Sequence, residues 1–114
     1  MDRKTLTGEY RGFKKEVADA LKSIKPEISI FGSMRTRKTS PRDVDVQIDV
    51  RHLSDSQFKK ARETIARIRK KYPDVDPMLY SWPTKKLPTM AKRKKMRWDG
   101  PWELHKQIAP DWKR

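Results

Sequence analysis

The sequence contains no cysteine and only two histidines, and both shortages narrow its chemistry. Without cysteine there is no disulfide, no thiolate metal ligand and no cysteine nucleophile. His52 and His105 are isolated in the sequence and lack the close spacing of a zinc-ligand pair. A zinc site is therefore not expected.

Long apolar segments are also missing. Hydrophobic residues make up only 34% of the 114 residues, and no run of them approaches the roughly 20 residues that a membrane-spanning helix needs. The first residues, from Met1 to Lys4, lack the apolar stretch of a signal peptide. We therefore expect a cytoplasmic protein that has no membrane partner.

Acidic residues are scarce relative to basic ones. There are 15 aspartates and glutamates against 29 lysines and arginines, which gives a formal net charge of +14. So large a charge on a short chain predicts attraction to polyanions, such as nucleic acid or nucleotide phosphates. The length allows one domain without an independent second lobe. We expect a core over residues 1–83 and a basic, tryptophan-containing extension over residues 84–114, packed on or beside the core.

Apolar residues at helical spacing predict two helices in the core. The first runs over residues 7–24, and the second follows Ser54, which can cap it, with Gln57 completing a capping box. In the extension, helices are predicted over residues 87–98 and 101–108.

Three strands are predicted, over residues 28–31, 43–50 and 75–82. Pro77 places the third at a sheet edge or delays its start. The resulting fold class is α+β, with a small three-stranded mixed sheet backed by helices and a basic C-terminal helical tail.

The second strand carries the acidic residues that point to a function. Asp43 and Asp45 are one residue apart on an alternating strand, so their side chains lie on the same face. Like charges held so close repel, and the arrangement persists most easily when a divalent cation lies between them and a substrate. The alternative is that Asp43, Asp45 and Asp49 form the solvated face of an antiparallel strand, and that Gly32 and Ser33 form an ordinary turn.

The whole pattern resembles the nucleotidyltransferase superfamily typified by DNA polymerase beta, and especially its minimal single-domain members. The likeness spans Ile28 to Tyr80: a hydrophobic-Gly-Ser strand end, a loop, Asp-hydrophobic-Asp, a helix and another carboxylate on the next strand. It implies that Asp43, Asp45 and a third carboxylate hold one or two magnesium ions. The candidates for the third are Asp76 and Asp74, and Asp76 is preferred because it lies further inside the strand.

The resemblance also implies a nucleotide-phosphate site in the loop between the first two strands. Gly32 lets the backbone approach the phosphates, and Ser33 contacts them through its hydroxyl and amide. Many relatives have small residues after this pair, and Pro77 beside the third carboxylate is unusual for the family. The basic residues found in the loop instead can neutralise a triphosphate: Arg35, Arg37, Lys38 and Arg42.

The implied activity is a magnesium-dependent transfer of a nucleoside monophosphate from a nucleoside triphosphate to a hydroxyl, with release of pyrophosphate. The basic surface favours a nucleic-acid end as acceptor. One alternative is a protein hydroxyl, as in protein-modifying members of toxin-antitoxin-like pairs, and another is a catalytically inactive nucleic-acid-binding module. A small single domain offers little surface to select the nucleobase. That surface is expected to come from a partner protein, from a homodimer or from the C-terminal tail.

A second basic cluster follows the third strand. We predict that it contacts nucleic acid without sequence preference, and that nearby tryptophans such as Trp82 can stack on bases, whereas Trp98 and Trp102 mainly pack. The alternative is a solvated helix face that favours solubility. The predicted nucleic-acid-binding residues are Lys85, Lys86, Lys92, Arg93, Lys94, Lys95 and Arg97.

Overall fold

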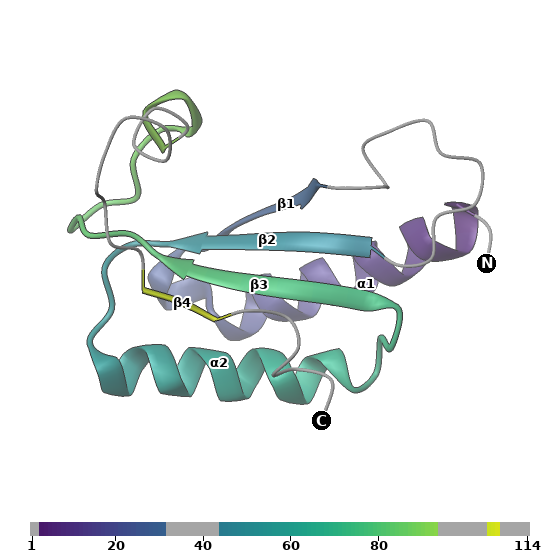
Figure 1. Cartoon of the computed structure of the whole chain (residues 1–114). Coiled ribbons are helices and arrows are strands. Elements are labelled where there is room, and N and C mark those ends of the chain that lie inside the picture. Colours follow the sequence, from purple (N-terminus) through teal and green to yellow (C-terminus); the bar gives the residue numbers. More distant parts are fainter. Residues whose placement is uncertain (1–2, 32–43, 94–104, 108–114) are drawn as a thin grey trace.

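The computed structural model describes residues 3–31, 44–93 and 105–107, and in them a small sheet lies against two helices (Figure 1). The predicted order of helix, strand, strand, helix and strand is confirmed. In chain order the elements are α1 (Arg3–Ala20), the 3-10 helix η1 (Lys22–Ile24), β1 (Glu27–Phe31), β2 (Val44–Val50), α2 (Asp55–Arg69), β3 (Val75–Ser81) and β4 (His105–Gln107).

The sheet is mixed, as predicted. Its strand order is β1-β2-β3-β4, with β2 parallel to β3 and the two other pairs antiparallel. The parallel pair is joined by α2, because a parallel connection has to return along the sheet. The α+β class with a mixed sheet backed by helices is therefore confirmed.

The short strand β4 departs from the predicted helix over residues 101–108, the remainder of which lies outside the described residues. Its three residues pair with Leu79–Ser81 at the edge of β3. Open backbone groups on a sheet edge favour strand addition, and such tertiary pairing outweighs weak helix propensity. β3 begins at Val75 and has a neighbouring strand on each side, so the prediction that Pro77 places it at a sheet edge or delays its start is wrong. Pro77 is tolerated because β4 pairs only with Leu79–Ser81, which leaves Pro77 without a β4 partner in the described part of the chain.

Both helices end close to where the apolar periodicity predicts. The first predicted helix is divided into α1 and η1, and Lys25 then adopts a left-handed conformation with φ of 48° before Pro26. The Ser54 hydroxyl accepts from the Gln57 amide at 3.2 Å, and the Gln57 side chain accepts from the Ser54 amide at 3.0 Å, so the capping box is confirmed. No helix in the described ranges is both long and apolar enough to cross a membrane.

The two faces of the sheet differ sharply. Val44, Val46 and Ile48 of β2 are fully buried under α1 and α2, where they form the core with residues such as Phe13 and Ile65. The alternate positions of β2 point to the opposite face, which the helices do not cover. That opposite face is called the open face below, and it carries the acidic residues.

Two glycines of α1 allow a matched test of this packing. A Cβ added at Gly12 would lie 2.8 Å from the Tyr72 ring, whereas a Cβ at Gly8 would meet nothing within 4 Å. Tyr72 has little freedom to move, since its hydroxyl donates to Glu16 and its ring packs edge-to-face on Phe13. We expect Gly12→Ala to lower the free energy of unfolding by about 1–3 kcal/mol, and Gly8→Ala to raise it by about 0.5–1 kcal/mol.

Urea unfolding of both variants measures the difference. Equal shifts of the two midpoints would contradict the contact between α1 and Tyr72.

Candidate active site

Two predicted metal ligands lie side by side on the open face. Asp45 on β2 and Asp76 on β3 are direct partners in the parallel register. Neighbouring strands are about 4.8 Å apart, and partner residues of parallel strands point to the same face. Asp45 is half-buried and Asp76 is only 8% exposed. Two carboxylates from separate strands are therefore brought together.

A cation from α2 lies beside this pair. Arg69 approaches Asp76, with 3.9 Å between its Nη2 and the Asp76 Oδ1. The guanidinium is held in place because it donates to the backbone carbonyls of Val75 at 3.1 Å and Pro73 at 2.8 Å. Its positive charge offsets part of the repulsion between the two carboxylates. Sequence reasoning missed this residue, although its place in the last turn before the acidic strand was a usable signal.

Asp74, the alternative third carboxylate, has different surroundings. It precedes β3 in a turn, where its carbonyl accepts from the Val44 amide at 2.8 Å. Its carboxylate lies close to Glu9 of α1, and the pKa of Glu9 is raised above 4.5 by burial first and then by hydrogen bonding and charge interaction with Asp74. The strand alternation that relates Asp74 to Asp76 does not extend into the turn. Asp74 therefore contacts α1, while Asp76 is next to Asp45.

The Glu9 and Asp74 pair predicts a pH dependence of stability. Because the pKa of Glu9 is raised in the folded state, its contribution to stability is fully present below pH 4.5 and is lost as the pH rises through the folded pKa. We expect Glu9→Gln, whose amide can still donate to Asp74, to be more stable than the wild type at pH 7 and to lose this advantage near pH 4. Urea midpoints measured across this range test it; an advantage that grows toward pH 4 would contradict the pairing.

The remaining predicted ligand and phosphate-binding residues lie outside the described residues: Asp43, Gly32, Ser33, Arg35, Arg37, Lys38 and Arg42. The described ends of that segment are Phe31 and Val44, and Phe31 pairs with Asp45. The described residues that flank these positions therefore lie beside the carboxylate pair. Within residues 3–31, 44–93 and 105–107, no group of three or more histidine, aspartate or glutamate side chains could hold a metal ion.

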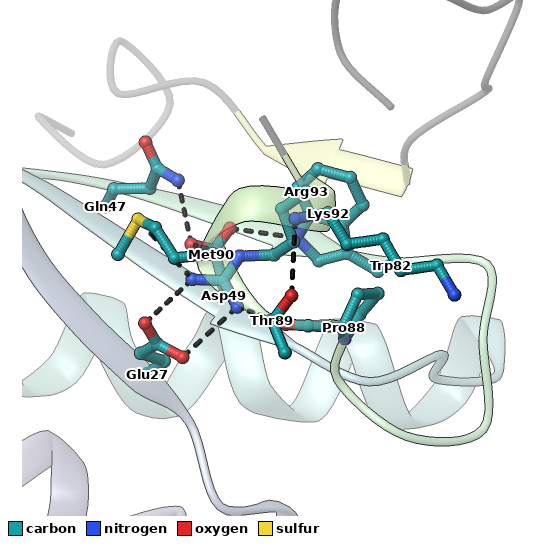
Figure 2. A network of polar contacts seen from close by, with 9 residues as sticks. All are labelled: Glu27, Gln47, Asp49, Trp82, Pro88, Thr89, Met90, Lys92 and Arg93. Atoms are coloured by element: carbon teal, nitrogen blue, oxygen red, sulfur yellow. Dashed lines mark hydrogen bonds and ion pairs between the residues drawn. The ribbon is translucent and has the colours of Figure 1, made fainter. Parts of the chain in front are cut away.

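A third acid of the open face, Asp49, is buried in a polar network (Figure 2). It is 1% exposed, and it accepts from the Trp82 indole at 2.9 Å and the Gln47 amide at 2.8 Å. The Arg93 Nε lies 3.6 Å from the Asp49 Oδ2. Asp49 is therefore a structural residue, and not part of a solvated strand face.

Arg93 holds the segment after β3 against the open face through contacts with residues of β1 and β2. It is 2% exposed and donates to both carboxylate oxygens of Glu27, at 2.8 and 3.1 Å, and to the Pro88 carbonyl. Figure 2 shows its guanidinium between Glu27 and Asp49. The prediction that Arg93 binds nucleic acid is wrong for this conformation, because Arg93 is buried and the carboxylates of Glu27 and Asp49 already compensate its charge.

The other residues of the second basic cluster divide into two groups. Lys85, Lys86 and Lys92 are exposed, as a nucleic-acid contact requires, whereas Lys94, Lys95 and Arg97 lie outside the described residues. Trp82 is fully buried and cannot stack on a base. Its indole nitrogen reaches Asp49 because a buried N–H needs an acceptor.

No family model, curated protein or solved structure matches the chain. The function is therefore argued from the geometry of the site.

Proposed function

We propose that this protein is a magnesium-dependent nucleotidyltransferase that moves a nucleoside monophosphate from a nucleoside triphosphate to a hydroxyl, with a nucleic-acid end as acceptor. The observation that supports the proposal is the pairing of Asp45 with Asp76 on adjacent parallel strands. Net charge of +14 supports a polyanionic substrate and acceptor.

The donor set fits magnesium. This ion prefers oxygen ligands and is usually held by one or two carboxylates, with water and substrate phosphates completing its shell. Asp45 and Asp76 would hold it, with Asp43 as the predicted further ligand. When bound, magnesium neutralises phosphate charge and polarises the reacting oxygens.

The chain's own residues bind the substrates and accept the proton. The predicted phosphate-binding residues Arg35, Arg37, Lys38 and Arg42 would bind and orient the triphosphate. Asp76 accepts the proton of the acceptor hydroxyl. A bond forms from the hydroxyl oxygen to the α-phosphorus, the bond between that phosphorus and the bridging oxygen breaks, and pyrophosphate leaves with the bond's electron pair.

One rival is favoured by a specific contact. Because Arg69 lies 3.9 Å from Asp76, it supplies positive charge that a metal would otherwise supply. A catalytically inactive nucleic-acid-binding module would have the same fold and basic surface, and Arg69 would neutralise the carboxylate pair permanently.

Transfer of label from each of four α-labelled nucleoside triphosphates, with and without magnesium, tests the proposal. RNA, DNA and protein acceptors are compared, and nucleic acids with a blocked 3′ end serve as the matched control. We expect magnesium-dependent labelling of nucleic acid that is lost with the blocked end. Labelling of protein alone would establish the protein-modifying alternative, and salt-sensitive binding without any transfer would establish the inactive module.

A further inference from the structure

A basic hollow lies at the end of the sheet remote from Asp45 and Asp76. Its volume is about 500 Å³. The lining residues come from the segment after α1, from the end of β2 and from the segment after β3: Ser23, Ile24, Lys25, Arg51, Lys85, Lys86 and Leu87. These seven residues are called the basic hollow below.

Hydrogen bonds join two of its three segments, and a local turn shapes the third. The left-handed conformation of Lys25 turns the chain from η1 toward β1, and the Lys25 amide donates to the Lys22 carbonyl. The His52 amide donates to the Thr84 carbonyl at 2.8 Å, which joins the end of β2 to the lysine-bearing segment. The Thr84 hydroxyl then donates to the Lys86 carbonyl at 2.6 Å. The hollow is thus part of the folded framework.

The charge of the hollow is of one sign. Four cations line it, Lys25, Arg51, Lys85 and Lys86, and no acidic residue does. None of the four takes part in an ion pair with a carboxylate among the residues that the structure describes. Arg51 donates from Nη1 to the His52 carbonyl at 2.9 Å, which orients a guanidinium that has further donors.

A second hollow offers a contrast. It is lined by Glu16, Asp19, Arg67 and Lys71, so its charges balance, and Lys71 is ion-paired to Glu16 at 2.8 Å. Two further hollows also lack acidic residues but hold fewer cations, with Lys4 and Arg11 in one and Lys60 in the other. The basic hollow, with four cations, is therefore the strongest candidate anion site among these hollows.

We propose that the basic hollow binds the sugar-phosphate backbone of the nucleic-acid acceptor, several nucleotides away from its reacting end. This inference rests on the proposed function for the acceptor's role. From Asp45 to Arg51 the chain follows β2, a distance of about 20 Å. At about 3.4 Å per nucleotide of a stacked strand, that distance corresponds to about six nucleotides.

The exposure of the cations suits contact with a nucleic-acid strand. Lys25, Lys85 and Lys86 are exposed and Arg51 is half-buried, so all four side chains can reach the phosphates of a strand that crosses the hollow. A flexible phosphodiester chain can enter the hollow, where lysine and arginine contacts to phosphates position it without reading its sequence. Ile24 and Leu87, both half-buried, add apolar wall for the sugars.

Fluorescence anisotropy with end-labelled single-stranded RNA and DNA of 4 and 12 nucleotides tests the inference. The variant Lys25→Gln/Lys85→Gln/Lys86→Gln is compared with Lys15→Gln/Lys59→Gln/Lys70→Gln, a control with the same loss of charge at three exposed positions outside the hollow. We expect the hollow variant to bind the 12-mer at least about tenfold more weakly, and to reduce the salt slope by about 2, at about 0.7 per lost contact. The control should change binding less than about threefold. The 4-mer is too short to reach both the hollow and the carboxylate pair, so the wild type should bind it more weakly than the 12-mer. Urea midpoints verify that both variants fold.

Three outcomes would overturn the inference: equal weakening by the hollow and control variants, equal affinity of the wild type for the 4-mer and the 12-mer, or weakened binding to phosphatidylserine vesicles with unchanged oligonucleotide binding. The proposed function fails separately. If the hollow variant binds oligonucleotides more weakly but no nucleotide transfer is found in any assay, the proposed enzymatic function is rejected and the phosphate site is retained. If nucleotide transfer is found but the hollow variant binds oligonucleotides as the wild type does, only the role of the hollow is rejected.

Discussion

Replacing Asp45 with asparagine is expected to lower the rate of nucleotidyl transfer by at least about a hundredfold. The substitution removes one of two adjacent carboxylate charges while preserving size, so the proposed magnesium ion would lose a ligand. Metal stabilisation of a reacting phosphoryl group is worth several kcal/mol, and each 1.4 kcal/mol corresponds to about tenfold in rate. Asp76→Asn should produce a similar loss, which single-turnover transfer of labelled nucleotide measures.

The control is Asp19→Asn, which makes the same charge change at an exposed position of α1. It should leave the rate within about twofold, because screened charges remote from the site contribute little. Asp74→Asn discriminates between the two candidates for the third ligand. If Asp74→Asn abolished transfer while Asp76→Asn preserved it, the assignment of Asp76 would be wrong.

Replacing Arg93 with alanine is expected to lower the free energy of unfolding by about 3 kcal/mol. Removing one partner of a buried ion pair typically costs about 3–5 kcal/mol, because the other charge is left without compensation. Asp49, at 1% exposure, would retain its bonds to Trp82 and Gln47, and the Glu27 side chain is 44% exposed. These remaining partners place the expected cost toward the low end. Equilibrium urea unfolding of the full chain measures it.

The matched control is Lys92→Ala, the adjacent and exposed residue of the same helical turn. Its effect should stay within about 0.5 kcal/mol, as is usual for surface substitutions. Arg93→Lys should recover only part of the loss, because an ammonium cannot reproduce the two-pronged contact with Glu27. Similar stabilities for Arg93→Ala and Lys92→Ala would show that the buried network does not support the fold.

Local patterns in the sequence were sufficient to predict most of the framework. Strict alternation from Val44 to Val50 identifies β2 and its buried face, and Ser54 with Gln57 fixes the start of α2 through contacts three residues apart. Such signals depend on neighbouring residues, so a linear reading detects them.

Contacts between distant residues account for what the sequence did not predict. Arg93 reaches Glu27 across 66 residues and Trp82 reaches Asp49 across 33. Alternation correctly places Asp49 on the open face, but it cannot reveal that residues 88–93 cover that position. The same limit explains β4, whose pairing depends on the open edge of β3.

The candidate site lies between these cases. The alternation of each strand predicts which side chains share a face with Asp45 and which share a face with Asp76. It does not predict that the two aspartates are register partners or that Arg69 approaches Asp76, because both depend on how β2 and β3 align. Asp74 and Asp76 share parity in the sequence. Only the turn before β3 separates them, since it brings Asp74 to Glu9.

Manganese titration followed by electron paramagnetic resonance tests the central claim most directly, because this ion accepts the same oxygen ligands as magnesium. Titrations of the wild type, Asp45→Asn, Asp76→Asn and the Asp19→Asn control would be compared in the presence of a nucleoside triphosphate. Urea unfolding of each protein would first establish that all four are folded under the titration conditions. We predict saturable binding that is weakened at least about tenfold by either site substitution, as expected when a ligand is lost, and is unchanged by the control. Equal binding by all four proteins would contradict a metal site shared by Asp45 and Asp76.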